Sequence, residues 1–440
     1  MVKTYIITSA QYEAQVNKQL MHNIDTYAKR HNAEVLILPM KGKSITEELL
    51  SDTLQEKYKI ITSDYSLNKN LKISNYELRP QQINPLTGLK RFAQGDKSFI
   101  FASPKQVLEY IANSYDIIPK AIMTTGAITK PNYNKRVRTG RIAEKDHEYG
   151  FVTVTIQNHK YFHFRQVKAL TNGDFFDIDG KYKNGKFESL SNVPALIVGD
   201  LHPYDTNKVH ERNTLEQIKQ LKPKNVFLHD TFNAKSISHH YKNHNIESFF
   251  VANTQGLNLG QELKHTAKAV QKYLNVLPKD SDLYIVASNH DEHLYRYLDE
   301  GRFVGDKGND LLGAQLYVSA LMGENPLEVG LSRYMNMPKN LHFIERNEGF
   351  KMLGYELGHH GDLGANGGRG SKRSLEEANG KSITGHTHSA MKMRNTYKVG
   401  TSTNLRLNYN RGYSNWTQTN AVLTPIGTVL LLNTIGKKWY

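Results

Sequence analysis

The sequence predicts a soluble α/β protein of two domains, residues 1–190 and residues 191–440. Three observations support this prediction. The chain opens with a strand–helix–strand pattern, which is typical of α/β proteins. Its 440 residues are too many for one ordinary core. From Val193 onward short apolar runs recur, and several of them end abruptly at a cluster of polar side chains.

The first domain is expected to have strands at 3–9, at 34–39 and within 151–169, and helices at 14–31 and near 105–113. The first helix is supported by Val16, Leu20 and Ile24, whose spacing places them on one helical face. A hairpin turn is expected at Asn184-Gly185, because both residue types accept a positive φ. The pattern changes after this turn, so the boundary is placed near residue 190.

The composition limits the available chemistry and partners. Cysteine is absent, so a metal ion would need His, Asp, Glu or Asn ligands. The formal charge of +15 favours a polyanionic partner such as DNA, although a Lys- and Asn-rich chain can also reflect AT-rich codons. No apolar stretch approaches the roughly 20 residues of a membrane span, and the N-terminus does not resemble a signal peptide. We therefore expect no membrane partner and a cytoplasmic location.

Polar clusters follow five apolar runs of the second domain. They are Asp200-Leu201-His202, His229-Asp230, Asn289-His290-Asp291, His359-His360-Gly361 and Gly385-His386-Thr387-His388. Buried strands that end in functional loops bring distant residues together at one edge of a sheet. A single such cluster is a weak signal, but five in this order predict a metal site.

This ordered set resembles the calcineurin-like metallophosphoesterase superfamily, in its SbcD-like nuclease branch, across residues 193–435. The resemblance implies a four-layer α/β/β/α sandwich that holds two divalent metal ions. It assigns Asp200, His202, Asp230 and His388 to one ion and Asp230, Asn289, His360 and His386 to the other, with Asp230 bridging. The second and third motifs normally carry Gly before the ligand, where this chain has His229 and Ser288.

The implied ligands also bear on the metal and its role. A carboxylate has two oxygens and can bridge two cations, which suits Asp230. Imidazole and carboxylate ligands suit manganese, zinc and iron(II), whereas magnesium prefers oxygen ligands and water. Manganese is therefore the first choice, with zinc, iron or magnesium as other possible ions. Such ions activate a water molecule for attack on phosphorus, so no covalent enzyme intermediate is needed.

Two residues beside the ligands are expected to take part in the reaction. The resemblance implies that His290 contacts the substrate and not a metal. Asp291 would hold the tautomer of the His290 ring or raise its pKa, so that the ring protonates the leaving oxygen. An equally compatible interpretation is that Asp291 caps the helix that follows it.

A glycine-rich segment, residues 364–371, follows the proposed His-Gly ligand. Its Arg369 could bind a phosphate through two hydrogen bonds, and Asn366 lies in the same segment. The alternative is a glycine loop without a ligand. His359 is an alternative ligand to His360, but the His-Gly pattern of the superfamily favours His360.

The expected function is a metal-dependent DNA nuclease. The layout resembles that of large-phage metallophosphoesterases of the DNA-transfer and host-DNA-degradation type, mainly through residues 364–371 and 385–389. A phage-encoded enzyme would act in the host cytoplasm, as an endonuclease or an exonuclease, and a homo-oligomer is compatible with the sequence. The alternatives are a small-nucleotide phosphodiesterase or phosphatase and a nucleic-acid-binding protein with a degenerate site.

Overall fold

The computed structural model describes residues 2–41, 48–93, 95, 97–114, 118–238, 258–408 and 410–439. The chain folds into two compact units. Unit 1 comprises Met1–Pro194, His388–Gly400 and Leu405–Tyr440, and unit 2 comprises Ala195–Thr387 and Thr401–Asn404. The units therefore differ from the contiguous segments 1–190 and 191–440 expected from the sequence, because most of the chain after residue 387 returns to unit 1.

Unit 1 begins with the expected strand–helix–strand element, which is confirmed as β1 (Lys3–Gln11), α1 (Lys18–His31) and β2 (Ala33–Met40). The side chain of Asn17 accepts a hydrogen bond from the amide of Leu20 and so fixes the start of α1. The strand order is β10-β9-β1-β2-β3, with β1, β2 and β3 (Lys59–Ile60) parallel. The expected strands within 151–169 are β9 (Gly150–Ile156) and β10 (Phe162–Lys168), which pair antiparallel.

The predicted hairpin turn is also confirmed. It joins β12 (Gly180–Lys183) to β13 (Lys186–Ser189), which form a small sheet with β11 (Phe175–Asp177). Asn184 and Gly185 have φ values of 52° and 67°. Positive φ at both positions is what a two-residue hairpin loop of type I′ requires, because its twist then matches that of the strands.

The prediction of a helix near residues 105–113 is wrong. This segment forms the strand β7 (Val107–Ile111), which pairs with β8 (Lys120–Thr124) on one side and with β21 (Met391–Met393) on the other. The conformation of this segment is decided by its pairing with other strands, and local periodicity does not reveal such pairing. The return of β21 to β7 also explains why residues 388–400 belong to unit 1.

The remaining elements of unit 1 are mostly short. They are α2 (Asp52–Lys57), β4 (Tyr65–Asn68), β5 (Leu71–Ser74), η1 (Leu89–Phe92), β6 (Ser98–Phe101), α3 (Arg138–Lys145), β22 (Thr396–Lys398), β23 (Thr419–Leu423) and β24 (Val429–Asn433). Strands β7, β8, β6, β5 and β4 are neighbours in that order.

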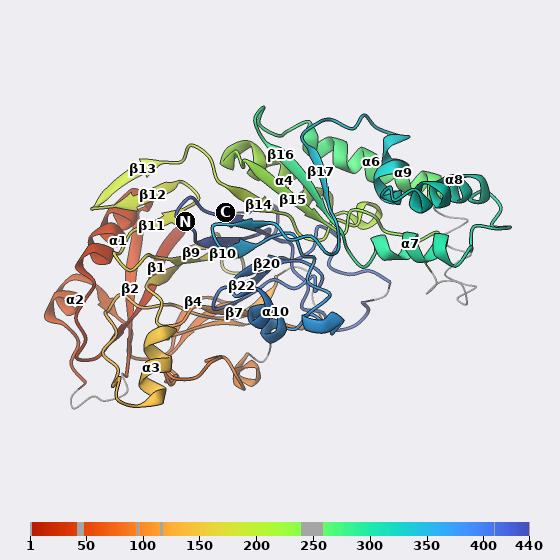
Figure 1. Cartoon of the computed structure of the whole chain (residues 1–440). Helices are drawn as coiled ribbons and strands as arrows, with labels where there is room; N and C mark the ends of the chain where they lie inside the picture. Colours follow the sequence, from red (N-terminus) through yellow and green to blue (C-terminus); the bar gives the residue numbers. More distant parts are fainter. Residues whose placement is uncertain are drawn as a thin grey trace. The chain divides into compact units, whose positions relative to one another are not determined.

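Unit 2 is organised by four parallel strands in the order β17-β16-β15-β14. Their bounds are Ala195–Ile197 for β14, Asn225–His229 for β15, Asp282–Val286 for β16 and Leu341–Ile344 for β17. Helix α4 (Lys208–Leu221) connects β14 to β15, and α6 (Leu259–Leu274) lies in the connection from β15 to β16 (Figure 1). Successive right-handed crossovers in one direction place both helices on the same face. They are joined by an ion pair between Lys272 and Glu211.

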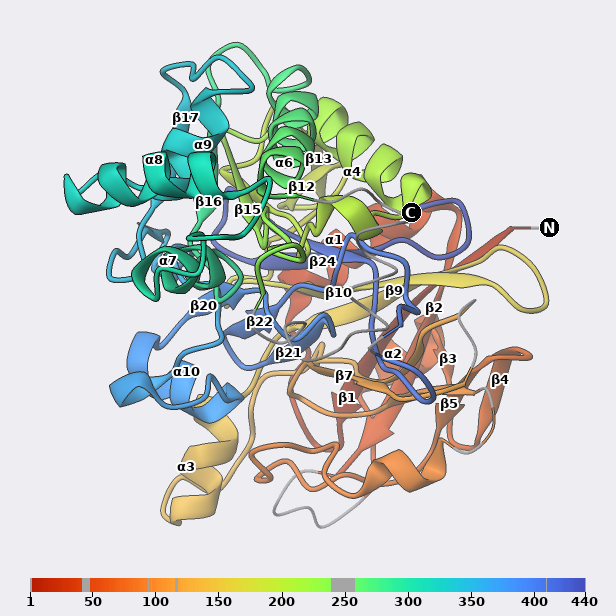
Figure 2. The same cartoon turned by 90° about the vertical axis from the view of Figure 1, so that its right-hand side faces the viewer.

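The rest of unit 2 consists of short helices and a second, smaller group of strands. The connection from β16 to β17 contains α7 (Asp291–Asp299), α8 (Asp310–Leu321) and α9 (Pro326–Ser332). These three helices contact one another (Figure 2). The other elements are η2 (Pro203–Asp205), β18 (Lys351–Met352), β19 (Tyr355–Glu356), η3 (Ala365–Gly367), α10 (Lys372–Asn379) and β20 (Ser382–Thr384). The mixed α/β class is confirmed. Among the described residues, no helix has both the length and the apolar character needed to cross a membrane.

Candidate metal centre

The carboxyl ends of the parallel strands in unit 2 carry the predicted ligands. Asp200 lies three residues beyond β14, Asp230 directly follows β15, and Asn289 lies three residues beyond β16. Backbone hydrogen bonds hold the first two loops together, since the amide of His202 donates to the carbonyl of Asp230 over 2.9 Å. Because parallel strands end at the same edge, residues far apart in the sequence meet there.

Asp230 is the centre of the cluster. Its side chain is buried, and its Oδ2 lies 3.3 Å from Nε2 of both His202 and His360. Its other oxygen, Oδ1, is buried and accepts no hydrogen bond from the described residues. Burial alone would raise the pKa of Asp230, but the nearby His360, His290 and His202 hold it well below its usual range. A buried carboxylate with two convergent imidazoles and a spare oxygen fits a bridging metal ligand.

The two histidines respond to the same carboxylate. Burial by itself would lower the pKa of His360, but the charge of Asp230 outweighs it and raises that pKa to about 9. The pKa of His202 is also raised, because Asp230 again outweighs burial. Nδ1 of His360 lies 3.4 Å from Nδ1 of His229, which aims Nε2 of His360 at Asp230. The neighbouring His359 is only partly buried, so the structure favours His360 at this position.

The Gly385-His386 segment reaches the same edge of the sheet. Nδ1 of His386 lies 3.2 Å from Oδ1 of Asn289, and the amide of Gly385 donates to the carbonyl of His360. A Cβ atom at Gly385 would lie only 2.2 Å from Oδ1 of Asp200. Glycine is therefore required here, because the backbone of this segment packs directly against the Asp200 carboxylate.

Three residues of the cluster have left-handed backbone conformations. His202, Asp230 and His386 have φ values of 40°, 48° and 73°. Such conformations are costly for residues with side chains and concentrate at functional sites. The tertiary contacts of unit 2 maintain this strain where the side chains converge.

His290 lies beside the cluster, with a different orienting group from the expected one. Ligating atoms of His202, Asp230 and His290 lie within 4.8 Å of one another, so His290 is also placed where it could bind a metal ion. Its Nδ1 lies 3.0 Å from the carbonyl oxygen of Asn233. Burial lowers the pKa of His290 to about 4, and the neutral ring with a proton on Nδ1 leaves Nε2 available.

Asp291 does not hold the His290 ring. It is the first residue of α7, and its Oδ2 accepts a hydrogen bond from the amide of Ser288 over 2.8 Å. Burial raises its pKa to about 7. The Ser288 amide precedes α7, so this bond does not satisfy an amide of the helix itself, and the capping interpretation stays a prediction.

The two predicted substrate-binding residues lie outside this cluster. Asn366 and Arg369 are exposed on the loop around η3, and neither side chain joins the described residues around Asp230. His388 is the first residue of a segment assigned to unit 1, where its ring packs against Trp416 with the ring centroids 4.2 Å apart. Roles for these three residues stay predictions.

Sequence reasoning missed Arg346, which joins two ligand-bearing loops. It lies two residues beyond β17, and its guanidinium binds both carboxylate oxygens of Asp362 over 2.8 and 2.6 Å. Its Nε also lies 2.9 Å from Glu292 in α7. Asp362 follows His360 by two residues, and Glu292 follows His290 by two. No local pattern distinguishes Arg346 from the other arginines, so only the fold identifies it.

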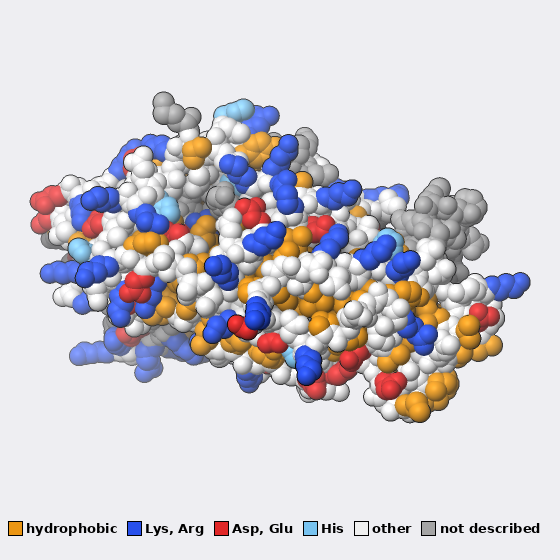
Figure 3. Space-filling view, turned by 90° about the horizontal axis from the view of Figure 1, so that it is seen from above, with side chains coloured by type: hydrophobic (Ala, Val, Ile, Leu, Met, Phe, Trp, Pro, Cys, Tyr) orange, Lys and Arg blue, Asp and Glu red, His pale blue; other side chains and the backbone are white. Residues whose placement is uncertain are grey.

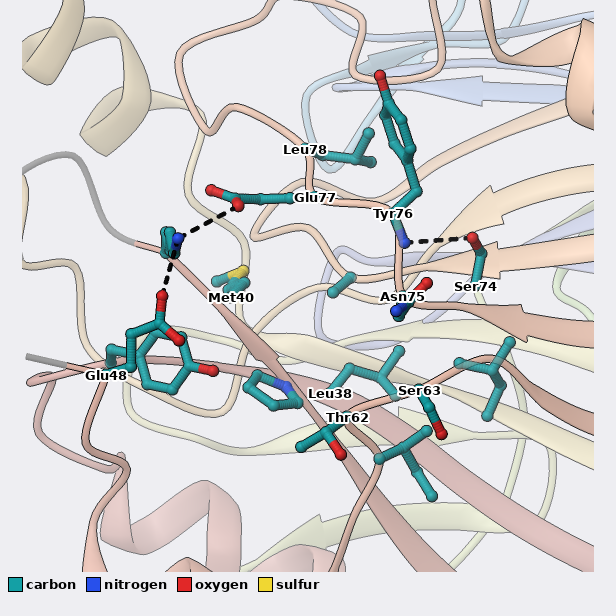
Figure 4. A pocket seen from close by; sticks show the side chains of 16 residues that line it. Leu38, Met40, Glu48, Thr62, Ser63, Ser74, Asn75, Tyr76, Glu77 and Leu78 are labelled. Atoms are coloured by element: carbon teal, nitrogen blue, oxygen red, sulfur yellow. Dashed lines mark hydrogen bonds and ion pairs between the residues drawn. The ribbon is translucent and has the colours of Figure 1, made fainter.

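Unit 1 has a concave site of a different character. A cavity of about 190 Å³ opens near the carboxyl end of β2, with Leu38, Met40 and Leu78 in its wall (Figure 4). At its rim, Lys41 pairs with Glu48 over 2.8 Å and approaches Glu77 at 3.7 Å. The two carboxylates outnumber the one amine, and this excess of negative charge at the rim disfavours a phosphate-bearing ligand.

The comparisons with known proteins give one distant relative. The chain is 26% identical over 471 aligned positions to "Protein A1" of Escherichia phage T5, covering 100% of this chain and 83% of that protein. No protein-family profile matches the chain, and no solved structure matches it.

Proposed function

We propose that this chain is a two-metal phosphodiester hydrolase that cleaves DNA. The observation that carries the proposal is the buried Asp230 carboxylate, on which His202 and His360 converge from different loops. A charged carboxylate and two imidazoles at 0–3% exposure are costly to bury, and such groups are typically paired or bound to metals. The proposed architecture remains the four-layer α/β/β/α sandwich of the calcineurin-like metallophosphoesterases.

The donor set fits divalent transition metal ions. One ion would be held by Asp200, His202, Asp230 and His388, and the other by Asp230, Asn289, His360 and His386, with manganese as the first choice. When bound, two such ions lower the pKa of water and neutralise phosphate oxygens.

The protein side chains supply orientation and proton transfer. The carbonyl of Asn233 orients the ring of His290 through Nδ1, which leaves Nε2 available for proton transfer. For Nε2 to protonate a leaving oxygen, its pKa must rise from about 4. The negative charge of a bound phosphodiester acts in that direction, because it favours the imidazolium.

We propose DNA as the substrate for two reasons, the positive charge of the chain and its similarity to a phage protein. The formal charge of +15 favours a polyanion. In Figure 3, Lys and Arg side chains are spread widely over the face shown, with fewer Asp and Glu side chains among them. The similarity to a protein of Escherichia phage T5 supports a phage-encoded enzyme that acts in the host cytoplasm.

One assay tests the proposal and its alternatives. Purified protein with Mn²⁺ is incubated with supercoiled plasmid, linear duplex, single-stranded DNA and a small chromogenic phosphodiester. We expect metal-dependent cleavage of DNA, and the products separate endonuclease from exonuclease action. Turnover of the small diester alone would instead favour a nucleotide phosphodiesterase. DNA binding without any hydrolysis would favour a binding protein with a degenerate site.

A further inference from the structure

Helix α6 is attached directly to the loops that carry the candidate metal ligands. The hydroxyl of Thr266 donates to the carbonyl of Thr231, the residue after Asp230, over 3.1 Å. The buried carboxylate of Glu262 accepts hydrogen bonds from the amides of Lys235 and Ser236 over 2.7 and 2.9 Å. These bonds fix the first half of α6 beside the candidate metal centre.

A pair of stacked rings makes a second connection. The ring of Tyr204, two residues beyond His202, stacks on the ring of His265 in α6. Their centroids are 4.3 Å apart, and the ring planes differ by 17°. Tyr204 is partly buried and His265 is exposed, so His265 is the outer ring of the pair. Burial and the charges of Lys268 and Lys264 lower the pKa of His265, which favours a neutral ring.

Two lysine amines flank this ring. Lys264 and Lys268 are exposed and one helical turn apart, about 5–6 Å between Cβ atoms. Within the part of the chain that the structure describes, neither amine forms an ion pair, although both lie near His265. Lys272, one turn further from the candidate centre, is neutralised by Glu211 over 2.8 Å. We call Lys264 and Lys268 the lysine stripe. Its charge, which no acidic side chain of the described residues neutralises, therefore lies toward the end of α6 that is attached to the metal-binding loops.

We propose that α6 binds a nucleic-acid strand next to the candidate metal centre, with Lys264 and Lys268 on neighbouring phosphates and His265 stacked on a base. The inference rests on the proposed function and specifies its substrate as a polymer. The lysine stripe beside an exposed ring combines the two contacts that bind single strands, which are charge on the backbone and stacking on the bases. A mononucleotide held at the candidate metal centre would not need this surface.

The test compares two double variants with the same change in charge. The first variant combines Lys264→Glu with Lys268→Glu and reverses the charge of the stripe. Lys219→Glu with Lys279→Glu is the matched control, because both lysines are exposed in unit 2, near the end of α4 and beyond the end of α6. Fluorescence anisotropy measures binding of a labelled single-stranded oligonucleotide without metal at several salt concentrations. Values of kcat and KM with Mn²⁺ are then measured on the oligonucleotide and on a small diester.

The stripe variant should bind the oligonucleotide about tenfold or more weakly, and its salt slope should fall by about 1.4, since each single-strand phosphate contact contributes about 0.7. Its KM for the oligonucleotide should rise, with a much smaller change on the small diester. A control variant that loses as much affinity as the stripe variant, or an unchanged salt slope, would overturn the inference.

A second pair of variants tests the ring. His265→Ala should weaken binding roughly tenfold with the salt slope retained, because base stacking is insensitive to salt, while His265→Phe should restore affinity. Equal affinity of the alanine variant and the unmodified chain would exclude the stacking role. Failure of the two proposals is distinguishable. Hydrolysis of neither substrate refutes the proposed reaction, whereas the binding data alone decide whether α6 is the contact surface.

Discussion

Metal binding should release protons, and Asp230 should control how many. The Asp230 carboxylate raises the pKa of His360 to about 9 and also raises that of His202. Without metal, His360 is therefore protonated at neutral pH. Imidazole must lose its proton to bind a metal ion, so binding and deprotonation are linked.

The structure sets the size of this linkage. Between pH 6 and pH 8, below the His360 pKa of about 9, the apparent Mn²⁺ affinity should rise about tenfold per pH unit from this residue alone, which is roughly 100-fold across the range. If His202 is also protonated, the apparent Mn²⁺ affinity rises more steeply with pH. In Asp230→Asn, burial is no longer opposed by the carboxylate, so the pKa values of both imidazoles should fall below about 6.5. The pH dependence above pH 7 should then largely disappear, and the affinity for the second ion should be lost.

Calorimetric titration of Mn²⁺ in buffers of different ionisation enthalpy counts the released protons. We expect about one or more at pH 7 for the unmodified chain and close to none for Asp230→Asn. NMR titration of the metal-free histidines reads the His360 pKa directly, with His360→Gln to assign the signal. No proton release by the unmodified chain, or an unchanged His360 pKa in Asp230→Asn, would refute the reasoning.

Three further predictions concern single residues. His290→Ala should reduce hydrolysis by roughly 10²–10⁴-fold with metal content retained by elemental analysis, and unchanged turnover would remove His290 from the mechanism. Arg346→Met should lower the free energy of unfolding by about 3 kcal/mol, because it leaves the Asp362 carboxylate unpaired, and adding Asp362→Asn should recover part of that loss in urea titrations. The pKa of the buried His163 is lowered to about 4 by burial, below its unfolded value of about 6.5, so stability should be lost as pH falls from about 6.5 to 4. His163→Phe should abolish about 2.5 kcal/mol of the loss between pH 7 and pH 4.5 in urea titrations, and parallel curves for the two proteins would contradict this.

The local sequence was sufficient to predict elements whose structure depends on contacts within one short segment of the chain. The strand–helix–strand start and the Asn184-Gly185 hairpin follow from periodicity and from backbone preferences, which act within a few residues. The same logic placed the polar clusters after buried strands. Because the strands are parallel, their loops had to share one edge, and Asp230 does lie within reach of His202 and His360.

Tertiary structure decided the features that depend on distant partners. Residues 107–111 form a strand because β8 and β21 flank them, and β21 lies almost 300 residues later in the chain. The His-Gly pattern favoured His360 over His359, but the contact of His360 with Asp230 appears only in the fold. The carbonyl that orients His290 belongs to Asn233, and the arginine that joins the ligand loops is Arg346. The sequence alone determined which segments end in metal-binding side chains, since that is a property of short stretches. Which atoms finally meet was decided by the fold, because distances between remote residues are fixed only when strands pair and side chains pack.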